Sequence, residues 1–329
     1  MDGLIEQAKS QLWKLVNELS LARKDGQPPR LQVSLYEYGK SSLPQDSGYL
    51  RMIAPLITDL DQISEKLFEL TTNGGDEYCG QAIRQASGDL AWSEDNGNLK
   101  IIFIAGNEEF TQGTADYRAS CAEAKRRGII VNTIFCGSQT EGARTGWQDG
   151  ATAGDGKYTN IDQEQKSFAM DAPQDEFLDS LGRELNATFL AWGEGGKAGK
   201  NRQLEQDKNA SSYSRQVVSE RTMAKASAQY SVAWDLVDGV REGRTELNGV
   251  ADKDLPFVLR DKTAREKRKY IEGLYTSRQV IGNKIRTLYL ERQRFIDQQL
   301  NGTSPGNTLD YAIIQAVREQ AGQRGFSFR

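Results

Sequence analysis

Two pairs of acidic side chains could carry out chemistry. One pair follows a turn, and the other follows a segment that has the pattern of a buried strand. Asp76 and Glu77 follow a glycine turn, and Glu108 and Glu109 follow the apolar run 99–105. Paired carboxylates can act in acid–base catalysis or supply oxygen ligands to a hard cation such as Mg²⁺. The alternative is structural, because acids at the start of a helix complement its dipole, and we favour that interpretation.

The composition removes several kinds of active site. The chain has no histidine, which excludes Ser-His-Asp and Cys-His catalysis and zinc held by histidine. Its three cysteines, Cys79, Cys121 and Cys136, are too few for a four-thiolate zinc site or a disulfide framework. We interpret them as buried thiols, with a Cys121–Cys136 bridge as the alternative, and we predict that the protein is not an enzyme.

Charge divides the chain into two parts. Residues 1–193 carry a net charge of −11 and residues 194–329 a net charge of +7, which together give the overall −4. Opposite signs allow the parts to attract each other. We predict an α/β domain at 1–193, a linker at 194–213 and a helical region at 214–329. No run of about 20 apolar residues predicts a transmembrane segment.

The first part alternates between the patterns of strands and helices. Strands are predicted at 31–36, 50–57, 99–105, 129–135 and 157–161. Helices are predicted at 3–19, 60–70, 77–92, 114–127 and 174–187. Apolar strands separated by helices indicate a doubly wound, mostly parallel sheet with both faces covered.

The second part is helical in pattern after a glycine-rich linker. Helices are predicted at 213–240, 261–300 and 308–322. In the longest of them, one heptad position holds Leu274, Ile281, Leu288 and Phe295, and the other holds Ile271, Arg278, Ile285 and Arg292. Because arginines interrupt this coiled-coil-like seam, we favour a helical hairpin or a helix docked on the first domain over a free coiled coil.

Five segments in the first part resemble von Willebrand factor A-type (VWA) domains, in the order found in that family. They are Met1–Lys9, Asn73–Asp76, Ile101–Glu108, Gly128–Gly137 and Asp155–Tyr158. The segments 103–110, 128–137 and 156–162 are similar to a group of bacterial VWA proteins of poorly defined function. The resemblance covers residues 1–193 and implies a VWA-like, Rossmann-like fold.

VWA domains usually carry a metal-ion-dependent adhesion site at the carboxyl ends of their strands. The resemblance places the threonine of that site at Asp76 and its aspartate at Asn107, and the Asp-x-Ser-x-Ser loop would lie before Met1. It therefore implies a degenerate site, in which Asp76 and Asn107 are the remnant ligands. We expect Mg²⁺ only if the upstream loop is restored.

The resemblance also implies that the first, central strand is missing. Its two neighbours would then have unpaired backbone groups. We interpret the chain as truncated at its N-terminus, with a filling segment from the same chain or a second copy as the alternative. The location would be cytoplasmic for a complete chain, and the periplasm or cell envelope if a signal peptide lies upstream.

Together these observations predict a binding or scaffold protein that uses the strand-end loops 74–79, 106–113 and 137–149. Glu108, Glu109, Arg144 and Trp147 are the candidate contacts with an unidentified protein partner, and core packing is the favoured alternative for Trp147. The basic helical tail is expected to dock on the first domain or on a partner. The alternatives are a carboxylate-based hydrolase at the same loops, or nucleic-acid or membrane-surface binding by the tail. We expect no small-molecule substrate.

Overall fold

A computed structural model describes residues 2–161, 170–299 and 309–328, and its contacts divide the chain into two compact units. Unit 1 comprises Met1–Ile57, Lys66–Phe168 and Pro305–Arg329, and unit 2 comprises Thr58–Glu65 and Ala169–Ser304. The division differs from the predicted boundary at 193. Within the described residues, no helix is long and apolar enough to cross a bilayer.

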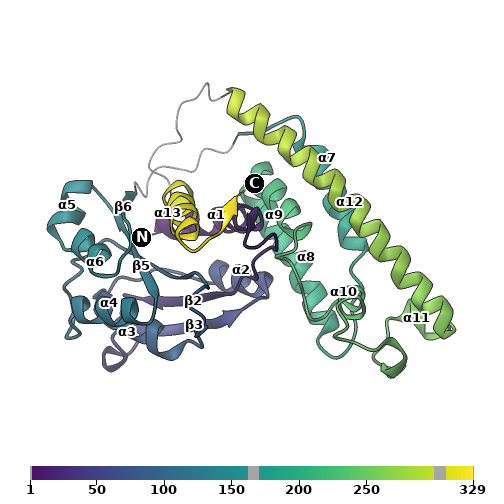
Figure 1. Ribbon diagram of the computed structural model, residues 1–329, viewed down its shortest axis with the longest axis horizontal. Coiled ribbons are helices and arrows are strands. Elements are labelled where there is room, and N and C mark those ends of the chain that lie inside the picture. Colours follow the sequence, from purple (N-terminus) through teal and green to yellow (C-terminus); the bar gives the residue numbers. More distant parts are fainter. Residues whose placement is uncertain (1, 162–169, 300–308, 329) are drawn as a thin grey trace. The chain divides into compact units, whose positions relative to one another are not determined.

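Unit 1 is built on a parallel sheet of three strands in the order β4-β5-β6 (Figure 1). The strands are β4 (Lys100–Gly106), β5 (Ile129–Cys136) and β6 (Tyr158–Ile161). Every residue of β5 is buried, as the predicted apolar run requires for a strand covered on both faces. The prediction of parallel strands alternating with helices is confirmed for this part of the chain.

Helices cover both faces of this sheet, because successive side chains of β4 point to opposite sides. Ile104 packs with α3 (Cys79–Asp89) and α4 (Tyr117–Arg126), whereas Ile101 and Phe103 pack with α1 (Asp2–Ser20) and α13 (Leu309–Gln323). Two short helices, α5 (Gln139–Arg144) and α6 (Trp147–Ala153), follow β5. Unit 1 is therefore a three-layer α/β structure.

A separate antiparallel pair also lies in unit 1. It consists of β2 (Val33–Tyr38) and β3 (Leu50–Ile57), with a short 3-10 helix (Gln45–Ser47) between them. The pair forms its own sheet, and within the described residues neither strand pairs with β4 through backbone hydrogen bonds. The structure thus shows a mixed α/β fold, in which the two sheets do not form one continuous doubly wound sheet.

The C-terminal segment belongs to unit 1, which corrects the prediction that it is part of the helical tail. α13 (Leu309–Gln323) packs against α1, and β7 (Ser327–Phe328) pairs with β1 (Ala22–Arg23). The amide of Gln320 exchanges two hydrogen bonds with the buried Asn132 of β5, at 2.7 and 3.0 Å. Side chains 188 residues apart in sequence thus join within one core.

Unit 2 is helical. Its helices are α7 (Asp175–Ala187), α8 (Gly196–Tyr213), α9 (Arg215–Lys225), α10 (Leu236–Arg241), α11 (Phe257–Arg260), a 3-10 helix (Leu247–Gly249), α12 (Ala264–Gln299) and the first turns of α2 (Leu60–Phe68). The predicted linker at 194–213 is wrong, because most of it is α8. That helix buries polar side chains, Gln203 and Gln206 among them, so its inner face has no apolar period to recognise.

The arginines in the seam of α12 are ion-paired within unit 2. Arg292 is fully buried and bonds the carboxylate of Asp175 at 2.5 Å. Arg278 bonds Asp235 at 2.8 Å and Asp238 at 2.5 Å. The helix packs on α7, α9 and α10, so both predicted heptad positions face partner helices of the same unit.

A second buried network lies among α2, α8 and α9. Arg221 is 1% exposed and bonds Asp61 at 2.7 Å and Asp207 at 2.6 Å. Lys225 bonds the same Asp207 carboxylate at 2.7 Å, and the hydroxyl of Tyr230 donates to Asp61. The two cations hold the pKa of Asp207 at about 2, below its usual range.

Candidate functional site

The carboxyl ends of β4 and β5 coincide, because the strands are parallel and Gly106 pairs in register with Phe135. Loops that follow such strands meet at one edge of the sheet, where α/β proteins commonly bind their ligands. After β4 come Asn107, Glu108 and Glu109, all exposed. After β5 comes α5, which ends at the exposed Arg144. Four of the predicted site residues therefore belong to this edge.

Glu77, one of the acids in the two predicted carboxylate pairs, fixes the loop after β4. Its Oε2 accepts hydrogen bonds from the backbone N–H groups of Asn107 at 3.1 Å and Glu108 at 3.3 Å. Its own N–H donates to Oε1 of Gln112 at 2.7 Å. A Cβ at Gly106 would lie 2.1 Å from that Oε2, so the carboxylate requires glycine there. One buried side chain thus ties the turn before α3 to the end of β4.

Burial also sets the electrostatics of this carboxylate. Loss of solvent raises the pKa of Glu77, and the two backbone N–H groups oppose the shift because they stabilise the charged form. Asp76, its neighbour and the predicted ligand, is exposed, and its carboxylate accepts a 3.5 Å hydrogen bond from Tyr78. The side chain that reaches the end of β4 is therefore Glu77 and not Asp76.

Trp147 is part of the core beneath the loops. It is 0% exposed, its Nε1 donates to the carbonyl of Glu108 at 2.8 Å, and its ring lies edge-on to Phe110 at 4.8 Å. Gly146, with φ of 94°, starts the short helix that carries it. A partner cannot touch a side chain buried in this way, so Trp147 is corrected from a candidate contact to a support of the Glu108 backbone.

The residues present do not fit a Mg²⁺ site. Mg²⁺ requires several oxygen ligands in octahedral geometry. Asp76 and Asn107 offer one carboxylate and one neutral amide, and Oε2 of Glu77 is already bonded to two N–H groups. In the part of the chain that the structure describes, no group of three or more acidic or cysteine residues is placed to hold a metal ion. We therefore assign no role to a metal.

The cysteines do not form nucleophilic or redox centres at this edge. All three are free and buried, so the predicted alternative of a Cys121–Cys136 bridge is wrong. Burial raises the pKa of Cys121 and of Cys136 to about 12. Thiols with such values stay protonated at neutral pH and do not react readily.

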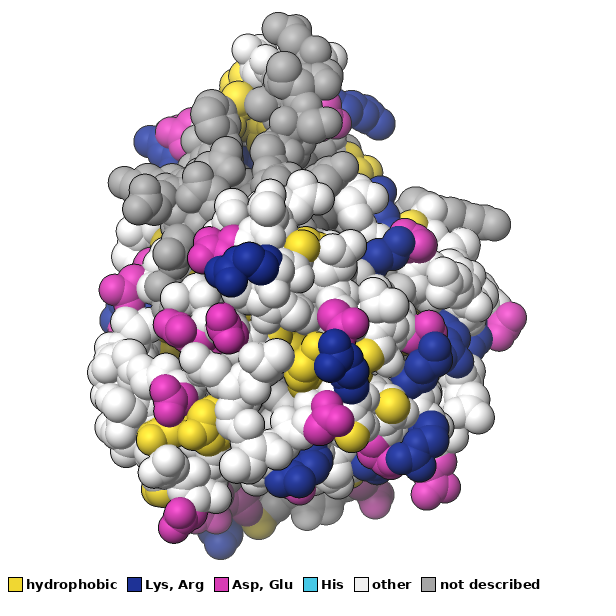
Figure 2. All heavy atoms as spheres, turned by 90° about the vertical axis from the view of Figure 1, so that its left-hand side faces the viewer, with side chains coloured by type: hydrophobic (Ala, Val, Ile, Leu, Met, Phe, Trp, Pro, Cys, Tyr) yellow, Lys and Arg dark blue, Asp and Glu magenta, His cyan; other side chains and the backbone are white. Residues whose placement is uncertain are grey.

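The exposed surface here is polar and of mixed charge. Figure 2 shows the face of the molecule that carries α5 and α6, where acidic and basic side chains alternate and apolar atoms appear only in small patches. Interspersed charges give specificity to a protein contact more than they give affinity.

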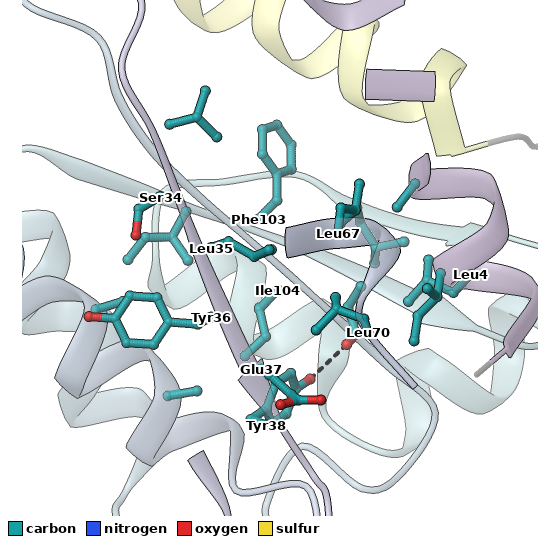
Figure 3. Close-up of a pocket in the computed structure, with 18 of the residues that line it drawn as sticks. Leu4, Ser34, Leu35, Tyr36, Glu37, Tyr38, Leu67, Leu70, Phe103 and Ile104 are labelled. Carbon is teal, nitrogen blue, oxygen red and sulfur yellow. Dashed lines mark hydrogen bonds between the residues drawn. The ribbon is translucent and has the colours of Figure 1, made fainter. Parts of the chain in front are cut away.

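A cavity of about 800 Å³ lies inside unit 1 and reaches this edge at one end. It is lined by β2 and β4 and by the apolar sides of α1 and α13 (Figure 3). Its walls are mostly aliphatic, with Leu4, Leu67 and Phe103 among them. At the end near Glu77, the Tyr38 hydroxyl of β2 donates a 2.8 Å hydrogen bond to the carbonyl of Ala105 in β4.

Comparisons with known proteins add no family assignment. No protein-family model matches the chain, and no curated protein matches it. The likeness to VWA domains rests on the sequence motifs alone.

Proposed function

We propose that this chain is a non-enzymatic binding protein, and that unit 1 is a VWA-like domain that contacts a protein partner with its strand-end loops. The contact residues in this proposal are Glu108, Glu109 and Arg144, at the ends of β4 and β5. The helical unit supplies a second contact through the exposed basic side chains at the start of α12, Arg265 and Arg268, which would meet an acidic surface.

The observation that carries the proposal is the anchoring of an exposed loop by buried groups. The side chain of Glu108 is exposed, yet its N–H is bonded to Glu77 and its carbonyl to Trp147. A loop fixed in this way loses little conformational entropy when it binds, which is the main advantage of a preorganised interface. The absence of histidine and the burial of the thiols weigh against a catalytic use of the same loops.

The proposal is tested by reversing charge at the loops. A partner co-purified with the chain should be lost from Glu108→Lys/Glu109→Lys by at least tenfold, because both carboxylates would then repel the complementary side chains. The matched control is Glu94→Lys, since Glu94 is equally acidic and exposed but precedes β4 at the opposite edge of the sheet. Equal recovery with the loop variant and with the wild type would refute the proposal.

A further inference from the structure

The cavity in unit 1 faces the edges of two strands. Ten consecutive residues of the β2 segment, Leu31–Lys40, line it, as do five consecutive residues of β4, Ile101–Ala105. Successive side chains of a strand point to opposite faces, so a cavity that touched one face would be lined by alternate residues. Uninterrupted lining shows that both strands present their edges to the same space.

These edges carry backbone groups without a strand partner. In the described residues β2 pairs only with β3, and β4 pairs only with β5. One carbonyl of β4, that of Ala105, is satisfied by the hydroxyl of Tyr38. An apolar small molecule would fill the volume but would supply no hydrogen-bond partner to the edges of β2 (Val33–Tyr38) and β4, which have no strand partner here, and this is unfavourable. A polypeptide strand satisfies both edges at once.

The walls define the side chains that such a strand would carry. On one face lie Leu15 of α1 and Phe103, and on the other Ile83 of α3 and Ile104. A strand covered on both faces is apolar throughout, rich in valine and isoleucine, and does not alternate with polar residues. At the rise of about 3.3 Å per residue, six or seven residues match the length of β4.

Charge gives the strand a direction. Of the acids that line the cavity, Glu18 and Glu37 are ion-paired with basic side chains, whereas Glu77 and Glu108 lie at the end where β4 terminates. A basic residue next to the apolar core of the strand would complement this end. The two stretches of the chain outside the described residues, 162–169 and 300–308, are polar or rich in glycine and proline, so their composition does not fit.

We propose that the groove between β2 and β4 binds an extended strand of a partner protein, six or seven apolar residues long with a basic residue at the end near Glu77 and Glu108. The strand pairs with both edges and joins the two sheets of unit 1 into one. The groove adjoins the exposed loop surface at Glu108, but Glu109 and Arg144 do not line it. Peptide binding in the groove is measured independently of the loop contact, so either proposal can fail while the other holds.

The test uses synthetic peptides with the full chain. The probe is a fluorescent peptide whose core of six alternating valine and isoleucine residues is flanked by lysines for solubility. Its matched control has the same side chains but methyl groups on alternate backbone nitrogens, which removes hydrogen bonds to one neighbouring strand. Fluorescence anisotropy should show binding of the probe at least tenfold tighter than binding of the control, and the probe should raise Tm.

A variant that fills the groove separates binding from folding. Ala8 of α1 lines the cavity and is half-buried, so Ala8→Phe should abolish peptide binding while far-UV circular dichroism and Tm stay at or above the wild-type values. Ala119→Phe, at an exposed position of α4, is the control and should bind as the wild type does.

Five results would overturn the proposal. Equal binding of the methylated peptide, or displacement of the probe by a fatty acid that itself binds tightly, would make this an apolar ligand site. Concentration-dependent dimerisation that excludes the peptide would assign the groove to a second copy. Stabilisation by the strand only when it is fused directly ahead of Asp2 would assign the groove to the same polypeptide. If neither the peptides nor the fatty acid bind, and Ala8→Phe raises Tm, the groove needs no occupant.

Discussion

The two units bury polar groups in opposite ways. Unit 2 encloses whole ion pairs, with Arg221 beside Asp61 and Arg292 beside Asp175, all of them at most 2% exposed. Unit 1 keeps most charges outside its core, where the sheet is packed with isoleucine, phenylalanine and thiol side chains. In unit 1 two strand edges that face an apolar groove have no strand partner among the described residues. Unit 2 thus pairs most of its buried charges within itself, although Nη1 of Arg292 has no hydrogen-bond partner in the described part of the chain, whereas unit 1 leaves a set of backbone groups for an external segment.

The largest effect is expected where the ion pair of unit 2 is broken. Asp61→Ala leaves the guanidinium of Arg221 buried beside only one carboxylate, and this should lower the free energy of unfolding by roughly 3–5 kcal/mol. Urea unfolding followed by circular dichroism measures it. Asp179→Ala, which removes the exposed Arg183–Asp179 pair on α7, is the control and should cost less than about 0.5 kcal/mol. Equal losses would mean that burial does not distinguish the pairs.

Two isoleucines of the parallel sheet test whether the groove is open in solution. Ile129 of β5 is 1% exposed, and Ile129→Ala should cost roughly 2–5 kcal/mol because it leaves a void in a packed core. Ile101 of β4 is half-buried and faces the groove, so Ile101→Ala should cost about 1 kcal/mol, measured by the same urea unfolding. Similar costs would show that the groove is closed in the free protein.

The buried carboxyl group of Asp238 in unit 2 predicts that the free energy of unfolding depends on pH. Burial, together with the nearby carboxylate of Asp235, raises the pKa of Asp238 to about 6, and Arg278 opposes the shift. A raised carboxyl pKa means that the folded state holds its proton more tightly than the unfolded state. The associated stability is therefore complete below pH ~4 and is lost as the pH rises to about 6.

Asp238→Asn should remove this loss, because the amide oxygen still accepts from Arg278 and has no charge to bury. We expect the variant to match the wild type at pH 4 and to be more stable by about 2 kcal/mol at pH 7, in thermal or urea unfolding. The pKa of Asp207 is lowered to about 2, so its charged form stabilises the folded state. Asp207→Asn should therefore destabilise the protein at pH 7. A parallel pH profile for wild type and Asp238→Asn would contradict the assignment.

The smallest effect concerns the thiols of unit 1. Because burial keeps Cys121 and Cys136 protonated, a disulfide reagent at pH 8 should label the native protein far more slowly than the protein in urea. Mass spectrometry counts the labelled sites. Rapid labelling of the native state would indicate that the core of unit 1 opens locally.

The sequence predicted most elements of unit 1 because periodicity records burial directly. The apolar runs at 99–105 and 129–135 are β4 and β5, and the helix predicted at 60–70 is α2, where Oδ1 of Asp59 accepts from the N–H groups of Asp61 and Gln62. The predicted helix at 174–187 is α7, which belongs to unit 2. Long-range pairing could not be predicted in the same way. No pattern in the sequence indicates that the side chain of Gln320 bonds to that of Asn132.

Errors arose where polar residues are buried. The buried residues of α8 are glycine, glutamine and alanine, so a hydrophobic pattern cannot distinguish this helix from a solvated linker. The same limit applies to the candidate site. Exposed Glu108 and Glu109 are predicted from their position after a strand, whereas the pattern names Asp76 and Glu77 together and does not tell the exposed carboxylate from the buried one.

The return of α13 and β7 to unit 1 has a consequence for biosynthesis. Unit 1 gains its last helix only after the ribosome has made the whole of Ala169–Ser304. At about 5–20 residues per second, that delay is on the order of ten seconds. During this time one face of the sheet in nascent unit 1 lacks the cover of α13, and the apolar side chains of that face stay exposed while unit 2 is synthesised. Early termination near the 3′ end of the message would therefore damage the part of the protein that was made first.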